Sequence, residues 1–222
     1  MLRLASSSPR RVSLVRALAL DAEIAPADID ETLFASPALA KAVAVARPGD
    51  VTLAADTQLE RDGERINKPA DPGDAVTMLA DLAASREHEA RSEVVVVNAA
   101  GRTLRFAVRT RVTMERASLR EIEHYVSTGE PLDKAGGYAI QGIGAGLVAS
   151  YDGCYANITG LPLCHTYHAL RRAGVVSAER PEVVCQRHFA FVCPVWRIAQ
   201  RQGRLLRDGG EYRSWRDDVD GG

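Results

Sequence analysis

Apolar residues recur along the chain with two periods, one typical of strands and one typical of helices. Strands are expected over residues 2–5, 51–56, 93–98, 103–114 and 144–151. Helices are expected from Pro9 after an N-cap at Ser8, over residues 73–83, from Ser118 to just before Gly129, and over residues 161–172. Strands that alternate with helices predict an α/β fold.

Two segments carry detailed local signals. In residues 103–114 the apolar side chains share one face and arginines occupy the other, and the turn at Gly101 makes this strand the second arm of a hairpin. Ser118 and Glu121 have the spacing of a capping box.

The pattern weakens after Gly174. Residues 178–222 are rich in arginine and acidic side chains, with one apolar patch, FAFVCPVW, at residues 189–196. We expect no second folded domain there, and the segment is predicted to be dispensable unless the patch covers a lobe or a dimer face.

Composition narrows the class of protein. A chain of 222 residues with 46% hydrophobic residues can bury a core of one large or two small domains. The formal net charge of -1 argues against a nucleic-acid partner, and the absence of a long apolar run argues against a membrane partner. We expect a cytoplasmic location, with the four cysteines as reduced thiols.

Lysine is rare, because Lys41, Lys68 and Lys134 are the only lysines among 28 basic residues. Arginine cannot replace a compact ammonium at every phosphate or carboxylate contact, so each lysine is a candidate for function. For Lys41 and Lys134, a phosphate contact and a local carboxylate pair remain equal alternatives.

Other candidates for an anion site lie near the N-terminus. The stretch SSSPRR places the amides around Ser6 and the side chains of Arg10 and Arg11 at a helix start, which favours an anion. The alternative is an ordinary helix cap with solvated arginines. Asp56, in AADT at the end of a predicted strand, and Glu31, in DIDE, are carboxylates suited to base or metal chemistry.

These motifs occur in an order that resembles the Maf family of nucleoside triphosphate pyrophosphatases, also described as septum-formation inhibitors. They are SSSPRR, the carboxylate after ID, LAKA, ADT, KP, DKAGGYAIQG within residues 130–142, and GLPL. The resemblance covers residues 2 to about 174, so a Maf-like domain is expected at residues 1–175 and an extension of unknown role at 176–222.

The resemblance implies an α/β fold related to the inosine-triphosphate pyrophosphatases, with two lobes around a central cleft. It also implies hydrolysis of a nucleoside triphosphate to the monophosphate and pyrophosphate, a divalent cation (Mg, Mn or Co), and a link to cell-division arrest.

Three positions match the dTTP/UTP subgroup of that family rather than the 7-methyl-GTP subgroup. They are Arg10, Thr57 and Gln141. An amide such as that of Gln141 can both donate and accept hydrogen bonds along a pyrimidine edge, whereas a carboxylate only accepts. We therefore expect dTTP and UTP as substrates, with a 7-methyl-GTP enzyme as the alternative.

The expected mechanism follows from charge. Arg10, Arg11 and Lys68, with the Ser6 loop and a divalent cation, would neutralise the triphosphate. Asp56 would orient and deprotonate the attacking water, and Glu31 would help Asp56 to hold the metal.

Two departures from the family pattern are visible. The segment from Glu31 to Lys41 is short, and Ser92-Glu93 replaces a pair of small residues in a loop expected to approach the substrate. If these changes removed turnover, the protein would be a nucleotide-sensing regulator of septum formation rather than an enzyme.

Overall fold

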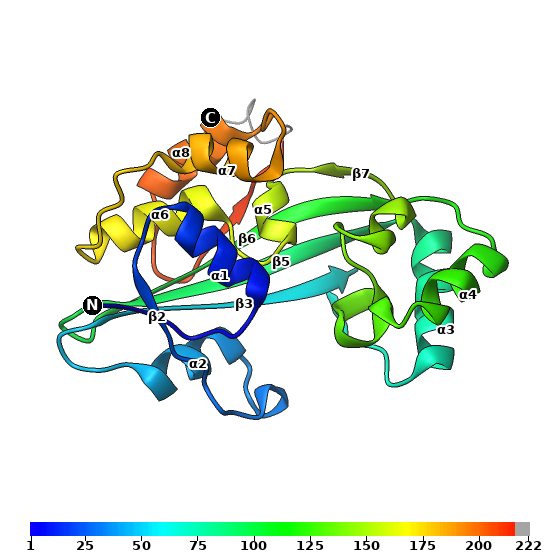
Figure 1. Ribbon diagram of the computed structural model, residues 1–222, viewed down its shortest axis with the longest axis horizontal. Coiled ribbons are helices and arrows are strands. Elements are labelled where there is room, and N and C mark those ends of the chain that lie inside the picture. The colour runs from blue at the N-terminus through cyan, green and yellow to red at the C-terminus, as the bar shows by residue number, and fades with distance from the viewer. Residues whose placement is uncertain (216–222) are drawn as a thin grey trace. The chain divides into compact units, whose positions relative to one another are not determined.

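The computed structural model describes residues 1–215 and confirms the α/β prediction. Within these residues an eight-stranded sheet has the order β2-β1-β3-β5-β6-β7, with β4 paired to β3 and β8 paired to β6 (Figure 1). The strands are β1 (Leu2–Leu4), β2 (Ala22–Ile24), β3 (Val51–Arg61), β4 (Glu64–Ile66), β5 (Glu87–Val97), β6 (Thr103–Met114), β7 (Val148–Asp152) and β8 (Gly210–Arg213). The helices are α1 (Pro9–Ala17), α2 (Pro37–Val45), α3 (Pro72–Ser85), α4 (Leu119–Ser127), α5 (Tyr155–Ile158), α6 (Leu163–Arg172), α7 (Pro181–Phe189) and α8 (Trp196–Arg204).

The chain divides into two compact units. The first contains residues 1–57, 92–109 and those from 153 onward, and the second contains residues 58–91 and 110–152. None of the helices within residues 1–215 combines the length and hydropathy that a membrane crossing requires.

The core of the first unit forms between the sheet and the helices that cover it. Strand β1 pairs in parallel with β2 and with β3, and Leu4 lies opposite Leu53 in the β1–β3 register. Both leucines are completely buried, together with Leu14 of α1 and Leu170 of α6. The spacing of apolar residues that predicted α1 and α6 therefore reflects burial against one hydrophobic cluster.

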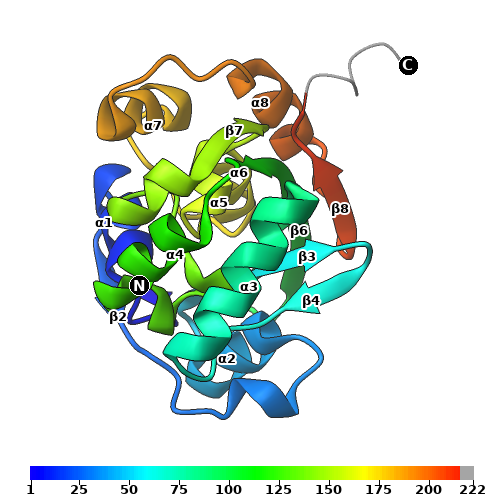
Figure 2. The same cartoon turned by 90° about the vertical axis from the view of Figure 1, so that its right-hand side faces the viewer.

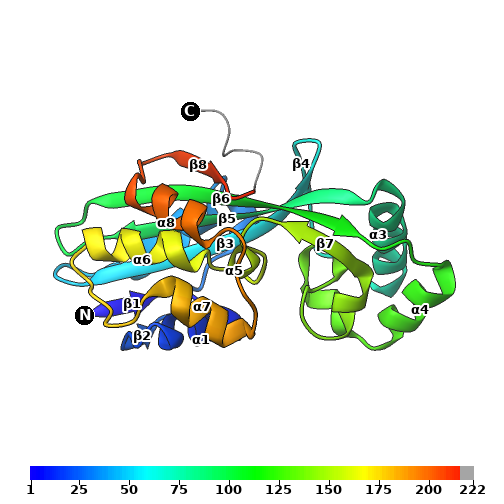
Figure 3. The same ribbon diagram turned by 90° about the horizontal axis from the view of Figure 1, so that it is seen from above.

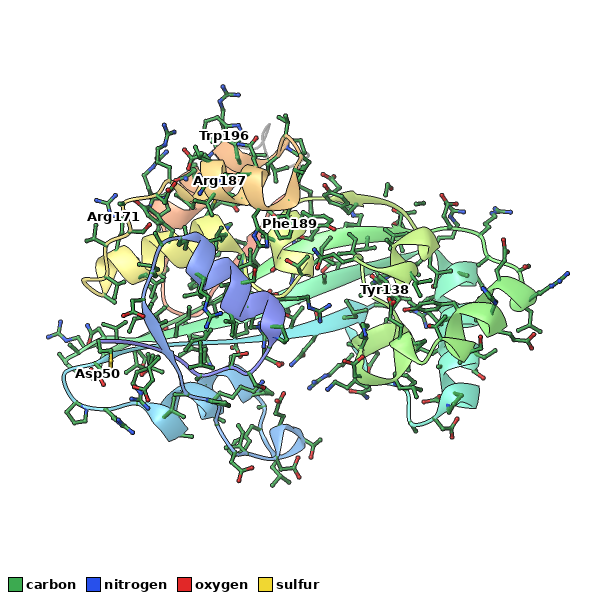
Figure 4. All side chains as sticks on the ribbon, viewed as in Figure 1. Asp50, Tyr138, Arg171, Arg187, Phe189 and Trp196 are labelled. Atoms are coloured by element: carbon green, nitrogen blue, oxygen red, sulfur yellow. The ribbon has the colours of Figure 1, made fainter. Side chains whose placement is uncertain are left out.

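The segment after residue 175 folds as part of the first unit rather than as a second domain. It forms α7, α8 and β8, and β8 extends the sheet by pairing in parallel with β6, as Figure 3 shows from above. Val195 and Ala199 are buried, and the ring of Phe189 lies 4.8 Å from that of Tyr155 on α5 (Figure 4). Part of the apolar patch thus covers the core of its own unit, and residues 216–222 of the predicted extension lie outside the described residues.

All four cysteines are free thiols, as expected. They are Cys154, Cys164, Cys185 and Cys193, and each is buried. Burial raises the pKa of the Cys154 thiol to about 12, so this group is protonated and inert at neutral pH.

In the second unit, α3 packs against α4 (Figure 2). The capping box is confirmed, because the Ser118 hydroxyl accepts from the Glu121 amide and the Glu121 carboxylate accepts from the Ser118 amide at 2.7 Å. Buried His88 contacts the Tyr138 hydroxyl at 2.5 Å. Burial, with a smaller contribution from Arg61, lowers the pKa of His88 to about 4, so the imidazole is neutral at pH 7.

One predicted strand starts later than expected. Residues 143–147 form a 3-10 helix, and strand β7 begins at Val148. The Glu130 carboxylate accepts the backbone N–H groups of Ile143 at 3.1 Å and Gly144 at 3.0 Å. These amides are therefore engaged by a side chain, which removes them from a strand ladder.

Candidate active site

The parallel pairing of β1 and β3 brings two predicted motifs together. Ser6 follows the end of β1, and Asp56 and Thr57 lie on β3 just beyond Leu53, the last residue that pairs with β1. The sequence predicted that Asp56 ends a strand, but in the structure it lies inside β3. The strand continues to Arg61 because its last residues pair with β4.

Arg11 is the centre of the first group of side chains. Its Nε donates to the Gly160 carbonyl at 2.9 Å, its Nη2 donates to the Thr57 hydroxyl at 3.1 Å, and its Nη1 lies 3.5 Å from the Ser6 hydroxyl. Burial lowers the pKa of Arg11, whereas the charges of Asp56 and Glu31 raise it. An arginine retains its proton in proteins, so a fixed positive charge lies close to two carboxylates.

The start of α1 differs from an ordinary capped helix. Ser8 is the N-cap residue, but its side chain makes no capping hydrogen bond. Arg10 is exposed, and within residues 1–215 its side chain forms neither a hydrogen bond nor an ion pair. Uncapped amides beside an available guanidinium favour an anion at this helix end.

Lys41 links the two predicted carboxylates. Its Nζ lies 3.3 Å from Asp56 Oδ1 and 2.9 Å from Glu31 Oε2. The side chains of Lys41 and Asp56 are both buried, whereas that of Glu31 is half exposed. Of the two alternatives for Lys41, the structure shows the carboxylate pairing.

Ser92 and Glu93, the pair that departs from the family pattern, both form side-chain hydrogen bonds within the first unit. The Ser92 hydroxyl lies 2.8 Å from that of Thr57 and donates to the Asn157 carbonyl at 3.0 Å. The Glu93 carboxylate accepts from Ser36, the N-cap residue of α2, at 2.5 Å. Ser92 therefore supports Thr57, and Glu93 is engaged by the start of α2.

Lys68, Lys134 and Gln141 belong to the second unit. Lys68 is exposed in the loop between β4 and α3. Gln141 is half-buried and lies just before the 3-10 helix of residues 143–147. Lys134 donates to the Asp133 carboxylate at 2.6 Å and to the Glu130 carbonyl at 2.7 Å, so it pairs locally. Their roles toward a substrate stay predictions.

A backbone contact connects the KP and DKAGGY motifs within the second unit. The Gly136 amide donates to the Asn67 carbonyl at 2.9 Å, next to Lys68. Gly136 has a φ of +69°, and a Cβ there would lie 2.6 Å from Leu59 Cδ1. The backbone conformation therefore favours glycine, and a Cβ here would also have to displace the Leu59 side chain.

We expect Gly136→Ala to destabilise the protein more than Gly101→Ala. Gly101 also has a positive φ, +78°, but a Cβ there meets no atom within 4 Å. Both changes incur about 1–2 kcal/mol of left-handed backbone strain, and only Gly136→Ala adds an overpacking cost of about 1 kcal/mol or more. Urea unfolding of the two variants measures the difference, and equal destabilisation would show that the contact with Leu59 is relieved at no cost.

The carboxylate oxygens of Asp56 and Glu31 are of the type that Mg²⁺ and Mn²⁺ prefer. Residues 1–215 contain no group of three or more His, Cys, Asp or Glu side chains arranged for a metal ion. A metal held here by two carboxylates would complete its coordination with water and phosphate oxygens, which is typical of Mg²⁺ at phosphate sites.

Comparison with known proteins decides the family. The family model described as Maf-like protein matches residues 1–173. The chain belongs to the Maf family. Among the curated members, a dTTP/UTP pyrophosphatase of Anaeromyxobacter dehalogenans (strain 2CP-1 / ATCC BAA-258) is 45% identical over 189 residues, which cover 80% of this chain and 97% of that protein.

Two further relatives have the same name. The dTTP/UTP pyrophosphatase of Myxococcus xanthus (strain DK1622) is 42% identical, covering 79% of this chain and 93% of its own. The dTTP/UTP pyrophosphatase of Geotalea uraniireducens (strain Rf4) is 39% identical, covering 78% of this chain and 95% of its own. The Maf match ends at residue 173, so α7, α8 and β8 lie beyond it.

Proposed function

We propose that this Maf-family protein hydrolyses dTTP and UTP to the nucleoside monophosphate and pyrophosphate. The curated relatives named dTTP/UTP pyrophosphatase support this activity. The observation that carries it is the position of Arg11, which Ser6, Thr57 and Gly160 hold beside the carboxylates of Asp56 and Glu31. Such a group offers a cation for phosphate oxygens next to a base for water.

Arg11 and the uncapped start of α1 would bind the phosphates. A triphosphate carries about four negative charges, which repel an incoming hydroxide unless cations neutralise them. The Arg11 guanidinium is already oriented by three hydrogen-bond partners, so little conformational freedom is lost on binding. Arg10 and Lys68, both exposed, would supply further positive charge.

Asp56 would act as the general base. Its carboxylate would accept a proton from water, and the oxygen of that water would attack the α-phosphorus. The bond from this phosphorus to the bridging oxygen breaks, and pyrophosphate leaves with that oxygen. Lys41, at 3.3 Å, would keep the Asp56 carboxylate in one orientation.

Asp56 and Glu31 would hold the divalent cation (Mg, Mn or Co). When bound, the cation would offset phosphate charge in the transition state. Lys41 lies between the same two carboxylates, so we expect its ammonium to lose one of these contacts when the cation binds.

Base selection is proposed for Arg10, Thr57 and Gln141. We expect Arg10→Trp/Thr57→Gln/Gln141→Glu to lower the kcat/KM ratio of dTTP to 7-methyl-GTP, since a carboxylate suits the donors of guanine. Arg11→Lys should slow all nucleotides alike, because a phosphate contact does not depend on the base. Thr57 also contacts Arg11, so part of the triple variant's loss should be common to all substrates.

Kinetics with dTTP, UTP and 7-methyl-GTP measure these ratios. An unchanged ratio in the triple variant would contradict the pyrimidine assignment and leave the pyrophosphatase activity standing.

The activity itself is tested by incubating the purified protein with these nucleotides and ATP in the presence of Mg²⁺, Mn²⁺ or Co²⁺. The expected result is release of pyrophosphate, without orthophosphate, from dTTP and UTP. Binding of nucleotides without release of pyrophosphate would support the nucleotide-sensing alternative.

A further inference from the structure

A pocket of about 580 Å³ lies among α6, α7 and α8 of the first unit. Figures 1 and 3 show these three helices side by side, with α6 next to α8. A volume of this size is typical of a site for a small molecule. Helices α7 and α8 lie beyond the residues that match the Maf family, so most of the wall is specific to the extension.

The wall of this pocket is strongly basic. Its arginines are Arg171, Arg180, Arg197, Arg201 and Arg204, and its carboxylate is Glu182. Arg180 forms an ion pair with Glu182. For the other four arginines, the part of the chain that the structure describes provides no carboxylate partner. The pocket therefore presents about four uncompensated positive charges.

A chain of hydrogen bonds links three side chains that line the pocket, of which Glu182 and Gln200 are buried and His168 is half-buried. Gln200 donates to Glu182 at 2.5 Å and accepts from His168 at 2.6 Å. Burial lowers the pKa of His168, and the nearby Arg204 and Arg171 lower it further, so His168 adds no charge at neutral pH. Among the described residues that line the pocket, Glu182 is the only carboxylate, and it is already paired with Arg180. The other arginines of the pocket therefore remain available to solvent or to a ligand.

Helices α6 and α8, which form two walls of the pocket, pack closely at Gly203. A Cβ on Gly203 of α8 would lie 2.5 Å from His168 Cδ2 and 3.2 Å from the Cys164 carbonyl oxygen of α6. The helices approach this closely because residue 203 has no side chain. The pocket is thus formed by packed helices rather than by surface side chains alone.

Aromatic rings orient two of the free arginines. The guanidinium of Arg197 lies 4.7 Å from the centre of the Trp196 ring, and that of Arg171 lies 5.7 Å from the centre of the Tyr167 ring. Figure 4 labels Arg171 on α6 and Trp196 on α8. Stacking on a ring restricts a guanidinium while leaving its N–H groups available along the edge.

We propose that this pocket binds a small polyphosphate anion, either inorganic or as the phosphate chain of a nucleotide, at a site separate from Asp56 and Arg11. Guanidinium groups bind phosphate oxygens through paired N–H donors. Four free arginines match the three to four charges of a di- or triphosphate better than the roughly two charges of a monophosphate. The proposal does not depend on the proposed hydrolysis.

Calorimetric titration of the full-length protein with tripolyphosphate, pyrophosphate and orthophosphate tests it, in a buffer with EDTA. We expect tripolyphosphate to bind more tightly than orthophosphate, and Arg201→Glu/Arg204→Glu to weaken it at least about tenfold. Both residues are exposed, so circular dichroism should show an unchanged fold. A parallel titration with ADP distinguishes a nucleotide ligand from the free anion. A site for a nucleotide should bind ADP more tightly than pyrophosphate, whereas a site for the free anion should not.

Two controls locate the binding. Arg47→Glu/Arg102→Glu makes the same change in charge at exposed residues of the same unit outside the pocket and should leave the Kd unchanged. Lys68→Ala, at a residue of the second unit proposed to bind the substrate's phosphates, should also leave it unchanged. Equal affinity in the wild type and in Arg201→Glu/Arg204→Glu, or loss of binding in Lys68→Ala, would overturn the proposal.

The same variants separate this proposal from the proposed function. Arg201→Glu/Arg204→Glu should release pyrophosphate from dTTP at the wild-type rate in the absence of added polyphosphate. If the wild type releases none but still binds tripolyphosphate through Arg201 and Arg204, the proposed hydrolysis fails and the second site stands.

Discussion

Replacement of Asp56 by asparagine should lower the turnover of dTTP by about 10²- to 10⁴-fold, with little change in KM. The asparagine side chain retains the shape of Asp56 but cannot take a proton from water. Lys41 would keep its contact with Glu31, so the substitution should not leave this buried ammonium without a partner.

Asp50→Asn is the matched control for this experiment. Asp50 lies just before the first residue of β3 and pairs with the N-terminal amine at 3.0 Å, and Figure 4 labels it. Asp50 also lies 4.0 Å from Arg3, so the same chemical change there can alter stability. It should leave kcat within about twofold, because the residue lies away from Asp56 and Arg11. If Asp56→Asn retained near-normal turnover, Asp56 would not be the base, and Glu31 would become the candidate.

Removal of residues 179–222 should abolish the folded state rather than leave activity intact. The deletion strips α7, α8 and β8 from the first unit and removes Val184, Cys185 and Leu206 from the hydrophobic cluster to which Leu170 belongs. Each large apolar side chain returned to water costs about 1.5–3 kcal/mol. Several such losses exceed the net stability of about 5–15 kcal/mol that a domain possesses. Size-exclusion chromatography and circular dichroism of the truncated chain measure the outcome.

A matched pair of point substitutions tests the same packing without a truncation. Val195 is completely buried and Val192 is 85% exposed, although both lie in the apolar patch. Val195→Asp places a carboxylate in an apolar environment and should cost several kcal/mol, about as much as other buried unpaired charges. Val192→Asp should change stability by no more than about 0.5 kcal/mol. A soluble, active truncated protein, or equal effects of the two substitutions, would show that the extension is not part of the core.

The sequence predicted elements best where large apolar residues follow one period. The strand at residues 103–114 and the capped helix after Ser118 match the structure closely, because their burial pattern and cap chemistry are both local. Helix α8 was missed for a physical reason. It buries Ala199, Gln200 and Gly203 rather than large apolar side chains, so its pattern resembles that of a solvated segment.

The site shows the same contrast. Ser6, Arg11 and Thr57 were all predicted, and parallel pairing of β1 with β3 brings them together. The support that Ser92 gives to Thr57 depends on β5 lying beside β3, a pairing between distant segments that no local pattern encodes. The start of α2 could have been recognised, since Ser36-Pro37 is a typical cap and first residue.

The two compact units are built from interleaved stretches of chain. The chain passes from one unit to the other at residues 57–58, 91–92, 109–110 and 152–153, and three of these passages lie within β3, β5 and β6. Neither unit is therefore a continuous peptide that a gene fragment could encode. In evolutionary terms, neither unit could be exchanged with that of another protein by a single recombination event. Changes in the two units must therefore accumulate by mutation within one gene.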